Sequence, residues 1–61
     1  MFTTLNDGTI ENLVHIVKIY VDGSNVIYER ARGSLDSVVE YFDTPEQALA
    51  RKTELMNQLA I

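Results

Sequence analysis

The basic side chains that could recognise an anion are concentrated at His15, Arg30 and Arg32. If the segments that carry them pair as an antiparallel hairpin, His15 lies across from Arg32, with Arg30 next along the same face. Guanidinium groups bind phosphates and carboxylates through paired hydrogen bonds. One hypothesis is therefore an anion-binding site at these three residues. The competing interpretation, which we favour, is that they border the core and pair with nearby acids.

Glu29, Asp36 and Glu40 are the acidic side chains that could act as a catalytic pair or bind a hard metal ion. No calcium-binding loop and no glycine-rich phosphate loop accompany them in the sequence, and the chain has no cysteine. The spacing places no serine, cysteine or carboxylate beside His15 to form a nucleophile–base pair. We therefore expect no enzyme activity, no catalytic residues, no metal site and no cofactor.

Three tyrosines, Tyr20, Tyr28 and Tyr41, could stack on nucleic-acid bases. In the expected sheet Tyr28 and Tyr41 share one face and Tyr20 lies on the other, so no exposed pair forms a platform. The net charge of −4 also opposes binding to phosphate backbones. Nucleic acid is not the expected partner. A nucleic-acid-associated regulator is kept as an alternative, with its contacts at Lys18, Arg30 and Arg32.

These groups must be positioned by the segment Leu13–Val21, the strongest strand pattern in the chain. Its β-branched residues favour extended backbone, and it contains neither glycine nor proline. Alternation places apolar side chains on both faces of this strand, and such a strand needs cover on both. One face holds Leu13, Val17, Ile19 and Val21, and the other holds Val14, Ile16 and Tyr20.

Two tight turns are predicted to build a meander around this strand. With Gly23 and Ser24 as a two-residue loop, Lys18 lies across from Glu29, whereas a shift of one residue sets Lys18 against Arg30. The first register is therefore predicted. Residues 33–34 offer a second two-residue loop. Residues 35–43 are predicted to form the last strand, so that the sheet spans 13–43, with a short helix as the alternative for this segment.

A helix is predicted over residues 44–60. Thr44 is the expected N-cap, Pro45 the first helical residue, and Gln47 completes a capping box. Arg51 is expected on the side of the helix that faces water. The predicted buried stripe consists of Ala48, Leu49, Leu55, Met56 and Leu59, with Lys52 laying its aliphatic stem along it.

Residues 1–12 contain the turn sequence Asn6-Asp7-Gly8, flanked by Phe2, Leu5 and Ile10. This segment is predicted to form either a short edge strand or a flap over one face of the sheet. Residues 1–61 are thus expected to form a single α+β domain. Its architecture is an antiparallel meander of three or four strands with one C-terminal helix packed on one face.

The helix is predicted to cover the face that carries Ile19, Val26 and Tyr28, with Val39 and Tyr41 on the same side. A chain of 61 residues buries only about 60% of the surface that its unfolded form exposes, and this one has no disulfide to compensate. We therefore expect the second face to be an interface, in a homodimer or with a protein partner. Its predicted residues are Val14, Ile16, Lys18, Tyr20, Ile27, Glu29, Val38 and Phe42.

The order of three strands followed by Phe42-Asp43-Thr44-Pro45-Glu46-Gln47-Ala48 opening a helix resembles the arm-type DNA-binding domains of some phage integrases. The resemblance covers the topology of residues 14–60. It implies DNA recognition by a basic sheet, whereas the strands of this chain offer only Lys18, Arg30 and Arg32 as strong bases. No functional residue is carried over from it.

The sequence contains no run of 18 apolar residues, and its first residues lack the pattern of a signal peptide, so we expect a cytoplasmic protein. The leading hypothesis is a small non-catalytic protein-interaction module that self-associates and modulates a protein partner. An accessory or inhibitor protein of a phage or mobile element would fit this size. The alternatives are the nucleic-acid-associated regulator and a binder of a small anionic ligand near His15.

Overall fold

A computed structural model of the protein describes residues 1–31 and 33–59, except for the side chains of residues 33–35. Two short strands, β1 (Phe2–Thr4) and β2 (Ile10–Asn12), precede a single 3₁₀ turn, η1 (Leu13–His15). The strands β3 (Ile16–Asp22), β4 (Asn25–Arg30) and β5 (Gly33–Tyr41) follow, and the helix α1 (Pro45–Leu59) ends the described chain. The predicted α+β fold, with a three-stranded antiparallel sheet and one C-terminal helix, is confirmed.

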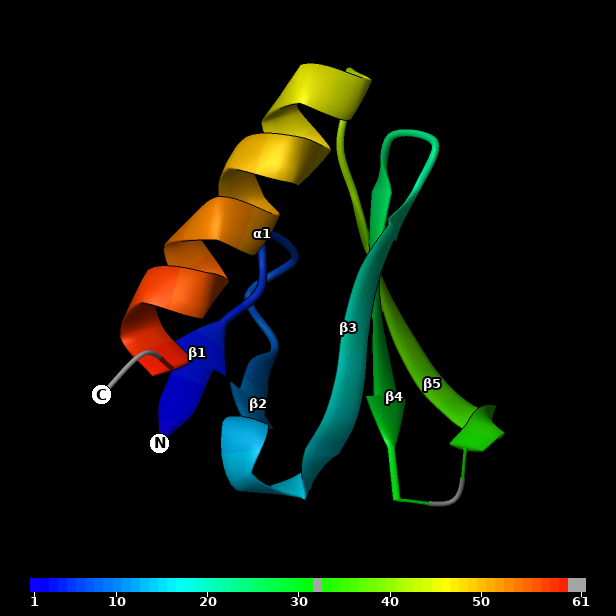
Figure 1. The fold of residues 1–61 in the computed structure, drawn as a ribbon, viewed down its shortest axis with the longest axis vertical. Coiled ribbons are helices and arrows are strands. Elements are labelled where there is room, and N and C mark those ends of the chain that lie inside the picture. Colours follow the sequence, from blue (N-terminus) through cyan, green and yellow to red (C-terminus); the bar gives the residue numbers. More distant parts are fainter. Residues whose placement is uncertain (32, 60–61) are drawn as a thin grey trace.

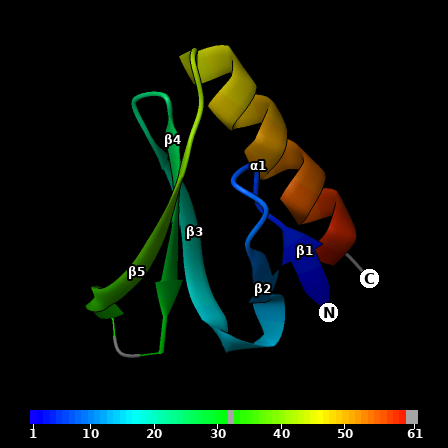
Figure 2. The same ribbon diagram turned by 180° about the vertical axis from the view of Figure 1, so that it is seen from behind.

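The helix α1 and the β1–β2 hairpin lie on the same side of the three-stranded sheet, as Figures 1 and 2 show from opposite directions. The N-terminal segment is therefore a flap. It forms its own two-stranded sheet, with Thr3 across from Glu11. It packs on the side of the sheet that the helix occupies. Among residues 1–31 and 33–59, no element covers the opposite face of the sheet.

The core lies between the sheet, the helix and the flap. Val26 and Tyr28 from β4 and Leu55 from α1 have no exposed surface. Leu5 and Leu13 bring the flap and η1 into the same cluster. Because β4 is the central strand, its inward side chains contact both the helix and the flap, and they hold the three layers together.

The register between β3 and β4 is the predicted one. Lys18 lies across from Glu29, and the two-residue loop is closed by the pair Asp22 and Asn25. Gly23 in this loop has a φ of +64°, which glycine adopts without strain. The predicted register of this hairpin, with Lys18 across from Glu29, is therefore confirmed.

A β-bulge interrupts β3 near its start, and the prediction of one regular strand over Leu13–Val21 is wrong there. Ile16 pairs with Arg30 and Lys18 with Glu29, which leaves Val17 as the extra residue. The bulge turns Ile16 toward the helix and leaves Val17 exposed. Upstream of it the chain leaves the sheet and enters η1, where the Asn12 Oδ1 atom accepts a hydrogen bond of 3.1 Å from the Val14 amide.

Residues 33–41 form a strand, as predicted, rather than a helix, but their register is one residue away from the predicted one. Tyr28 pairs with Val38 instead of Val39, because an irregularity at the end of β4 pairs Arg30 directly with Gly33. A shift of one residue exchanges the faces of a whole strand. Val38 and Glu40 therefore face the helix, and the prediction that put Val39 and Tyr41 on that side is wrong.

The start of α1 is capped by the residues named from the sequence. The Gln47 amide donates a hydrogen bond of 3.2 Å to the Thr44 Oγ1 atom, and the Gln47 side chain accepts one of 3.1 Å from the Asp43 amide. The second bond comes from the residue before the cap, one position earlier than in the usual capping box. The helix start is thus fixed by local chemistry.

Candidate interaction surfaces

The carboxylate of Glu40 is the centre of a buried polar cluster. Its side chain is 2% exposed. The Oε1 atom accepts hydrogen bonds from the Tyr28 hydroxyl at 2.6 Å and from Arg51 Nε at 3.1 Å, while Oε2 accepts one from the Asn6 amide at 2.8 Å. The cluster connects β4, β5, the helix and the flap loop through a single side chain.

This cluster explains how a charged group is buried in so small a domain. A buried carboxylate is tolerated only when it is paired and hydrogen-bonded. Burial and the bond to Glu40 raise the pKa of Tyr28, so the phenol stays protonated and can donate. Burial is the largest influence on the pKa of Arg51 and acts to lower it, but the bond to Glu40 and the other contacts of Arg51 together outweigh burial, and the pKa is raised. In the described part of the chain, no buried side-chain nitrogen or oxygen lacks a partner.

The inward position of Arg51 contradicts the prediction that this residue faces water, and it changes which residues α1 buries. Arg51 also donates hydrogen bonds to the Thr3 hydroxyl at 2.9 Å and to the Thr4 carbonyl at 3.0 Å. With Arg51 turned inward, Ala48 and Leu55 are the buried apolar residues of the helix. The other members of the predicted stripe, Leu49, Met56 and Leu59, are 57%, 58% and 40% exposed.

The proposed anion-binding residues are not gathered into an open site. The Arg30 guanidinium binds Glu11 through two hydrogen bonds, of 2.9 and 3.0 Å, and Asp36 through a third of 2.8 Å. These bonds raise the pKa of Arg30. His15 is an exposed residue of η1, and Arg32 lies outside the described residues. The pairing of Arg30 with local acids matches the competing interpretation of this region.

The acidic residues singled out from the sequence are likewise separated. Glu40 and Asp36 bind different arginines, and Glu29 lies across from Lys18 on the other face of the sheet. Within residues 1–31 and 33–59, no group of three histidine, cysteine, aspartate or glutamate side chains is placed to hold a metal ion. The strongest chemical cluster of the molecule is thus the structural one around Glu40.

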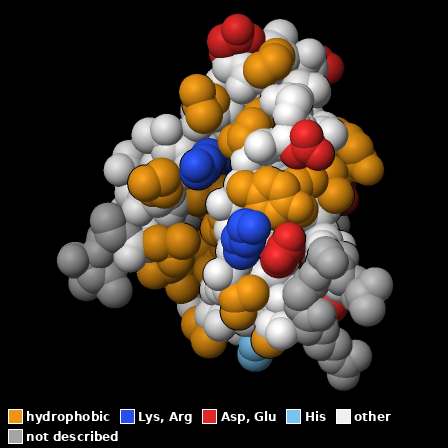
Figure 3. Space-filling model, turned by 45° about the vertical axis from the view of Figure 1, so that its right-hand side comes forward, with side chains coloured by type: hydrophobic (Ala, Val, Ile, Leu, Met, Phe, Trp, Pro, Cys, Tyr) orange, Lys and Arg blue, Asp and Glu red, His pale blue; other side chains and the backbone are white. Residues whose placement is uncertain are grey.

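The uncovered face of the three-stranded sheet, called here the open face, carries three cross-strand rows. The middle row is Tyr20, Ile27 and Val39, and its centre is buried because the neighbouring side chains flank it. Beside it, Tyr41 is 68% exposed. Figure 3 shows hydrophobic side chains grouped on this side of the molecule, with basic and acidic side chains among them. The outer rows are Lys18, Glu29 and Ser37, and Asp22, Asn25 and Tyr41.

Charges on the open face are arranged around this apolar row. The Lys18 Nζ atom lies 4.9 Å from the centre of the Tyr20 ring, a cation–π contact. Desolvation, followed by the charge of Glu29, raises the pKa of Tyr20. A positive and a negative side chain therefore stand next to each other at one end of the face.

The predicted interface residues lie on different faces of the sheet. Lys18, Tyr20, Ile27 and Glu29 lie on the open face, as expected. The prediction is wrong for Ile16, Val38 and Phe42, which pack against the core on the helix side, because of the bulge in β3 and the shifted register of β5. Val14 is exposed on η1. The residues that sequence reasoning missed on this face are Val39 and Tyr41.

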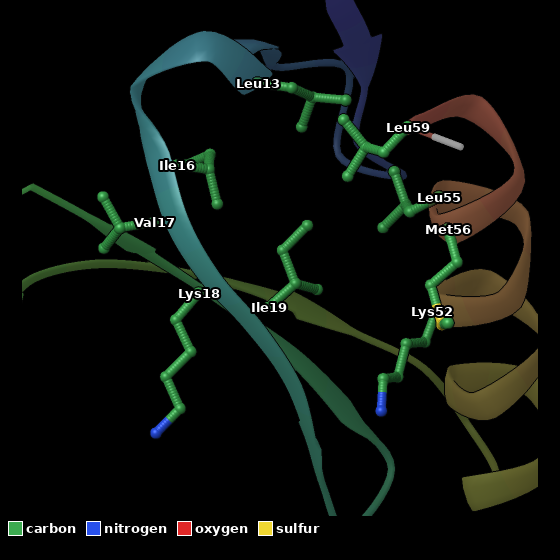
Figure 4. Close-up of a pocket in the computed structure, with 9 residues that line it drawn as sticks. All are labelled: Leu13, Ile16, Val17, Lys18, Ile19, Lys52, Leu55, Met56 and Leu59. Atoms are coloured by element: carbon green, nitrogen blue, oxygen red, sulfur yellow. The ribbon is translucent and has the colours of Figure 1, made fainter. Parts of the chain in front are cut away.

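A second surface is a groove between β3 and α1. It has a volume of about 220 Å³ and is lined mainly by apolar side chains. Figure 4 shows residues of β3 on one side and residues of α1 on the other, with Leu13 at one end. The exposed Met56 and Leu59 belong to this groove, as does Val17 of the bulge. The spacing of Ala48, Arg51 and Leu55 was the sequence signal that could have indicated the groove. When these three residues face inward, Met56 and Leu59 are turned toward the surface.

Comparison with protein-family models, with curated proteins and with solved structures finds no match to this chain. The resemblance to arm-type DNA-binding domains accordingly stays a similarity in the order of elements. No helix in the described part of the chain has both the length and the apolar character needed to cross a membrane. The open face and the groove are therefore the two surfaces of this chain that bear on its function.

Proposed function

We propose that this chain is a small, non-catalytic, cytoplasmic interaction module that forms a homodimer through the open face of its sheet and modulates a protein partner. The observation that carries the proposal is the central apolar row of this face, on which no element of residues 1–31 and 33–59 packs. Large apolar groups on an uncovered sheet are stabilised by association with a second surface. Tyr41, which adds an exposed ring beside the row, is the strongest candidate contact.

The charges of the open face support a second copy as the occupant. In a twofold symmetric dimer the same patch meets itself, so it must be self-complementary. Lys18 and Glu29 are neighbours at one end of the face. When two open faces pack against each other so that the facing strands of the two copies run antiparallel, Lys18 of each copy can lie opposite Glu29 of the other. Such an arrangement pairs Lys18 and Glu29 across the interface, at one edge of the apolar row.

The size of the chain supports the same proposal. A 61-residue domain without a disulfide has a small core, and part of its helix stripe is exposed. Dimerisation adds apolar burial without lengthening the chain. The nucleic-acid alternative has less support, because Arg30, which it needs, is occupied by Glu11 and Asp36.

Sedimentation equilibrium on the wild type and on Tyr41→Glu tests the proposal. We expect a mass of two chains for the wild type and of one chain for the variant, with unchanged circular dichroism. Phe2→Glu is the matched control, because Phe2 is equally exposed at 66% but lies on the flap. A wild type with the mass of one chain, or a Tyr41→Glu variant that still dimerises, would contradict the proposal.

A further inference from the structure

The groove between β3 and α1 combines an apolar lining with a positively charged end. Ile16 and Ile19 form the side from β3, and Leu55, Met56 and Leu59 form the side from α1. Its volume of about 220 Å³ exceeds that of an engineered apolar cavity of about 150 Å³ that binds benzene. The groove is therefore large enough for an alkyl chain, and its lining suits one.

The charge at the groove is unusual for this protein. Among the described residues, Arg30 and Arg51 are held in ion pairs, whereas Lys18 and Lys52 form none. Both of these lysines line the groove. Figure 4 shows both side chains extending away from Leu13 and Leu59, with Lys52 on the helix side of β3 and Lys18 on its other side. In a chain with a net charge of −4, both lysines thus line one apolar groove.

The geometry disfavours two other occupants. A peptide strand added along β3 would have to pass the bulge at Val17 and the side chain of Lys18, and bulges and lysines are features that protect an edge strand from pairing. A second copy that brought its own groove would place lysines against lysines. A small anion with an apolar tail meets neither obstacle.

We propose that this groove binds a linear apolar carboxylate of the fatty-acid type. The alkyl chain lies along Ile19, Leu55 and Met56, and the carboxylate is held by Lys52, while Lys18 adds a second positive charge from the open-face side of β3. The apolar tail gains from leaving water, and the head group gains a charge-assisted hydrogen bond to the Lys52 ammonium group. The helix side of this site belongs to α1 and takes no part in the dimer proposed above, whereas Lys18 lies at the edge that the groove shares with the open face.

The chain allows a direct test with decanoate as the probe. It contains two methionines, Met56 in the groove and Met1 on the flap, so protein labelled with ¹³C in the methionine methyl groups reports on the groove and carries its own reference. Titration with decanoate below its micelle concentration is expected to shift the Met56 signal in a saturable way and to leave the Met1 signal in place. No shift at Met56, or equal shifts at both methionines, would overturn the proposal.

The role of the lysines is tested separately. The double variant Lys18→Gln/Lys52→Gln is expected to bind decanoate about tenfold more weakly, because it loses both positive charges at the groove. Gln58→Ala, at an exposed position of α1 outside the groove, is the control and should bind as the wild type does. Decyltrimethylammonium, with the same tail and the opposite charge, should bind much more weakly than decanoate. Equal affinity of the double variant and the wild type, or of the two probes, would overturn the assignment.

Discussion

The Nε atom of Arg51 lies 3.1 Å from Oε1 of Glu40, whose side chain is 2% exposed. This ion pair determines how the helix sits on the sheet, because the arginine can reach the buried carboxylate only from the inner side of α1. The same rotation leaves Met56 and Leu59 at the surface, where they line the groove. A stabilising contact in the core therefore shapes a surface outside it.

The buried ion pair predicts a large effect of Arg51→Met. Removing the arginine leaves Glu40 as a buried charge without its cation, which costs about 3–5 kcal/mol of the free energy of unfolding. The double variant Arg51→Met/Glu40→Gln should recover most of this loss, because a neutral amide can still accept from Tyr28. Urea unfolding, monitored by circular dichroism, measures the free energy of unfolding of both variants. Glu54→Gln, which removes the exposed partner of Arg51, is the control. A cost below about 1 kcal/mol for Arg51→Met would show that the pair is not buried.

The raised pKa of Tyr28 predicts a loss of stability at alkaline pH. An ordinary tyrosine titrates near pH 10.0, and Tyr28 in the folded chain titrates higher. Above pH 10 the unfolded chain therefore loses a proton that the folded chain keeps. The contribution is complete below that pH, and the free energy of unfolding falls as the pH rises beyond it.

Urea unfolding between pH 9 and pH 11 measures this decline. Tyr28→Phe should lower stability at neutral pH, since Glu40 loses a donor, but should flatten the decline. Tyr41→Phe, which removes an exposed tyrosine on the opposite face, is the control. If Tyr28→Phe declined as steeply as the wild type, the phenol could not be the group responsible.

The bulge in β3 predicts opposite effects at two neighbouring residues. Ile16 packs against the core, so Ile16→Ala should cost about 2 kcal/mol or more of the free energy of unfolding. Val17 is exposed, and Val17→Ala should cost less than about 0.5 kcal/mol. Thermal or urea unfolding of the two variants measures the loss of stability in each. The reverse order would indicate a regular strand without a bulge.

The charge arrangement of the open face predicts a rescue. In the proposed dimer Glu29→Lys sets lysines of the two copies against each other and should weaken dimerisation at least tenfold. The exchange Lys18→Glu/Glu29→Lys restores alternating charges within and between copies, so dimerisation should return. Sedimentation velocity over a range of concentrations measures both dissociation constants. An exchange variant as weak as Glu29→Lys would exclude this pairing.

The local elements of this fold could be predicted from the sequence because local chemistry specifies them. Gly23 sets the first hairpin, the charges of Lys18 and Glu29 set its register, and Thr44 with Gln47 sets the start of the helix. Each depends on residues that are close in the chain or directly paired. The same is true of the turn at residues 6–8, where the Asp7 side chain accepts a hydrogen bond from the Thr9 amide at 2.9 Å.

The features that could not be predicted depend on competition between alternative pairings of strands and of charged side chains. The irregularity that pairs Arg30 with Gly33 shifts the register of β5 and exchanges the faces of Val38 and Val39 relative to the prediction. Arg51 is buried only because Glu40, eleven residues earlier, needs its charge. A rule that places charged residues in water has no means of foreseeing this, since neither side chain is tolerated inside without the other.

An isotope-filtered NOE measurement on a mixture of labelled and unlabelled chains detects contacts between copies only, and it tests the open face as the surface of association. We expect contacts between copies that involve Tyr20, Ile27, Val39 and Tyr41 of the open face, with none that involve Phe2 of the flap. Contacts between copies that come from the flap or from α1, or no such contacts at a concentration where the chain is well folded, would contradict the central claim that the open face is the surface through which this protein associates.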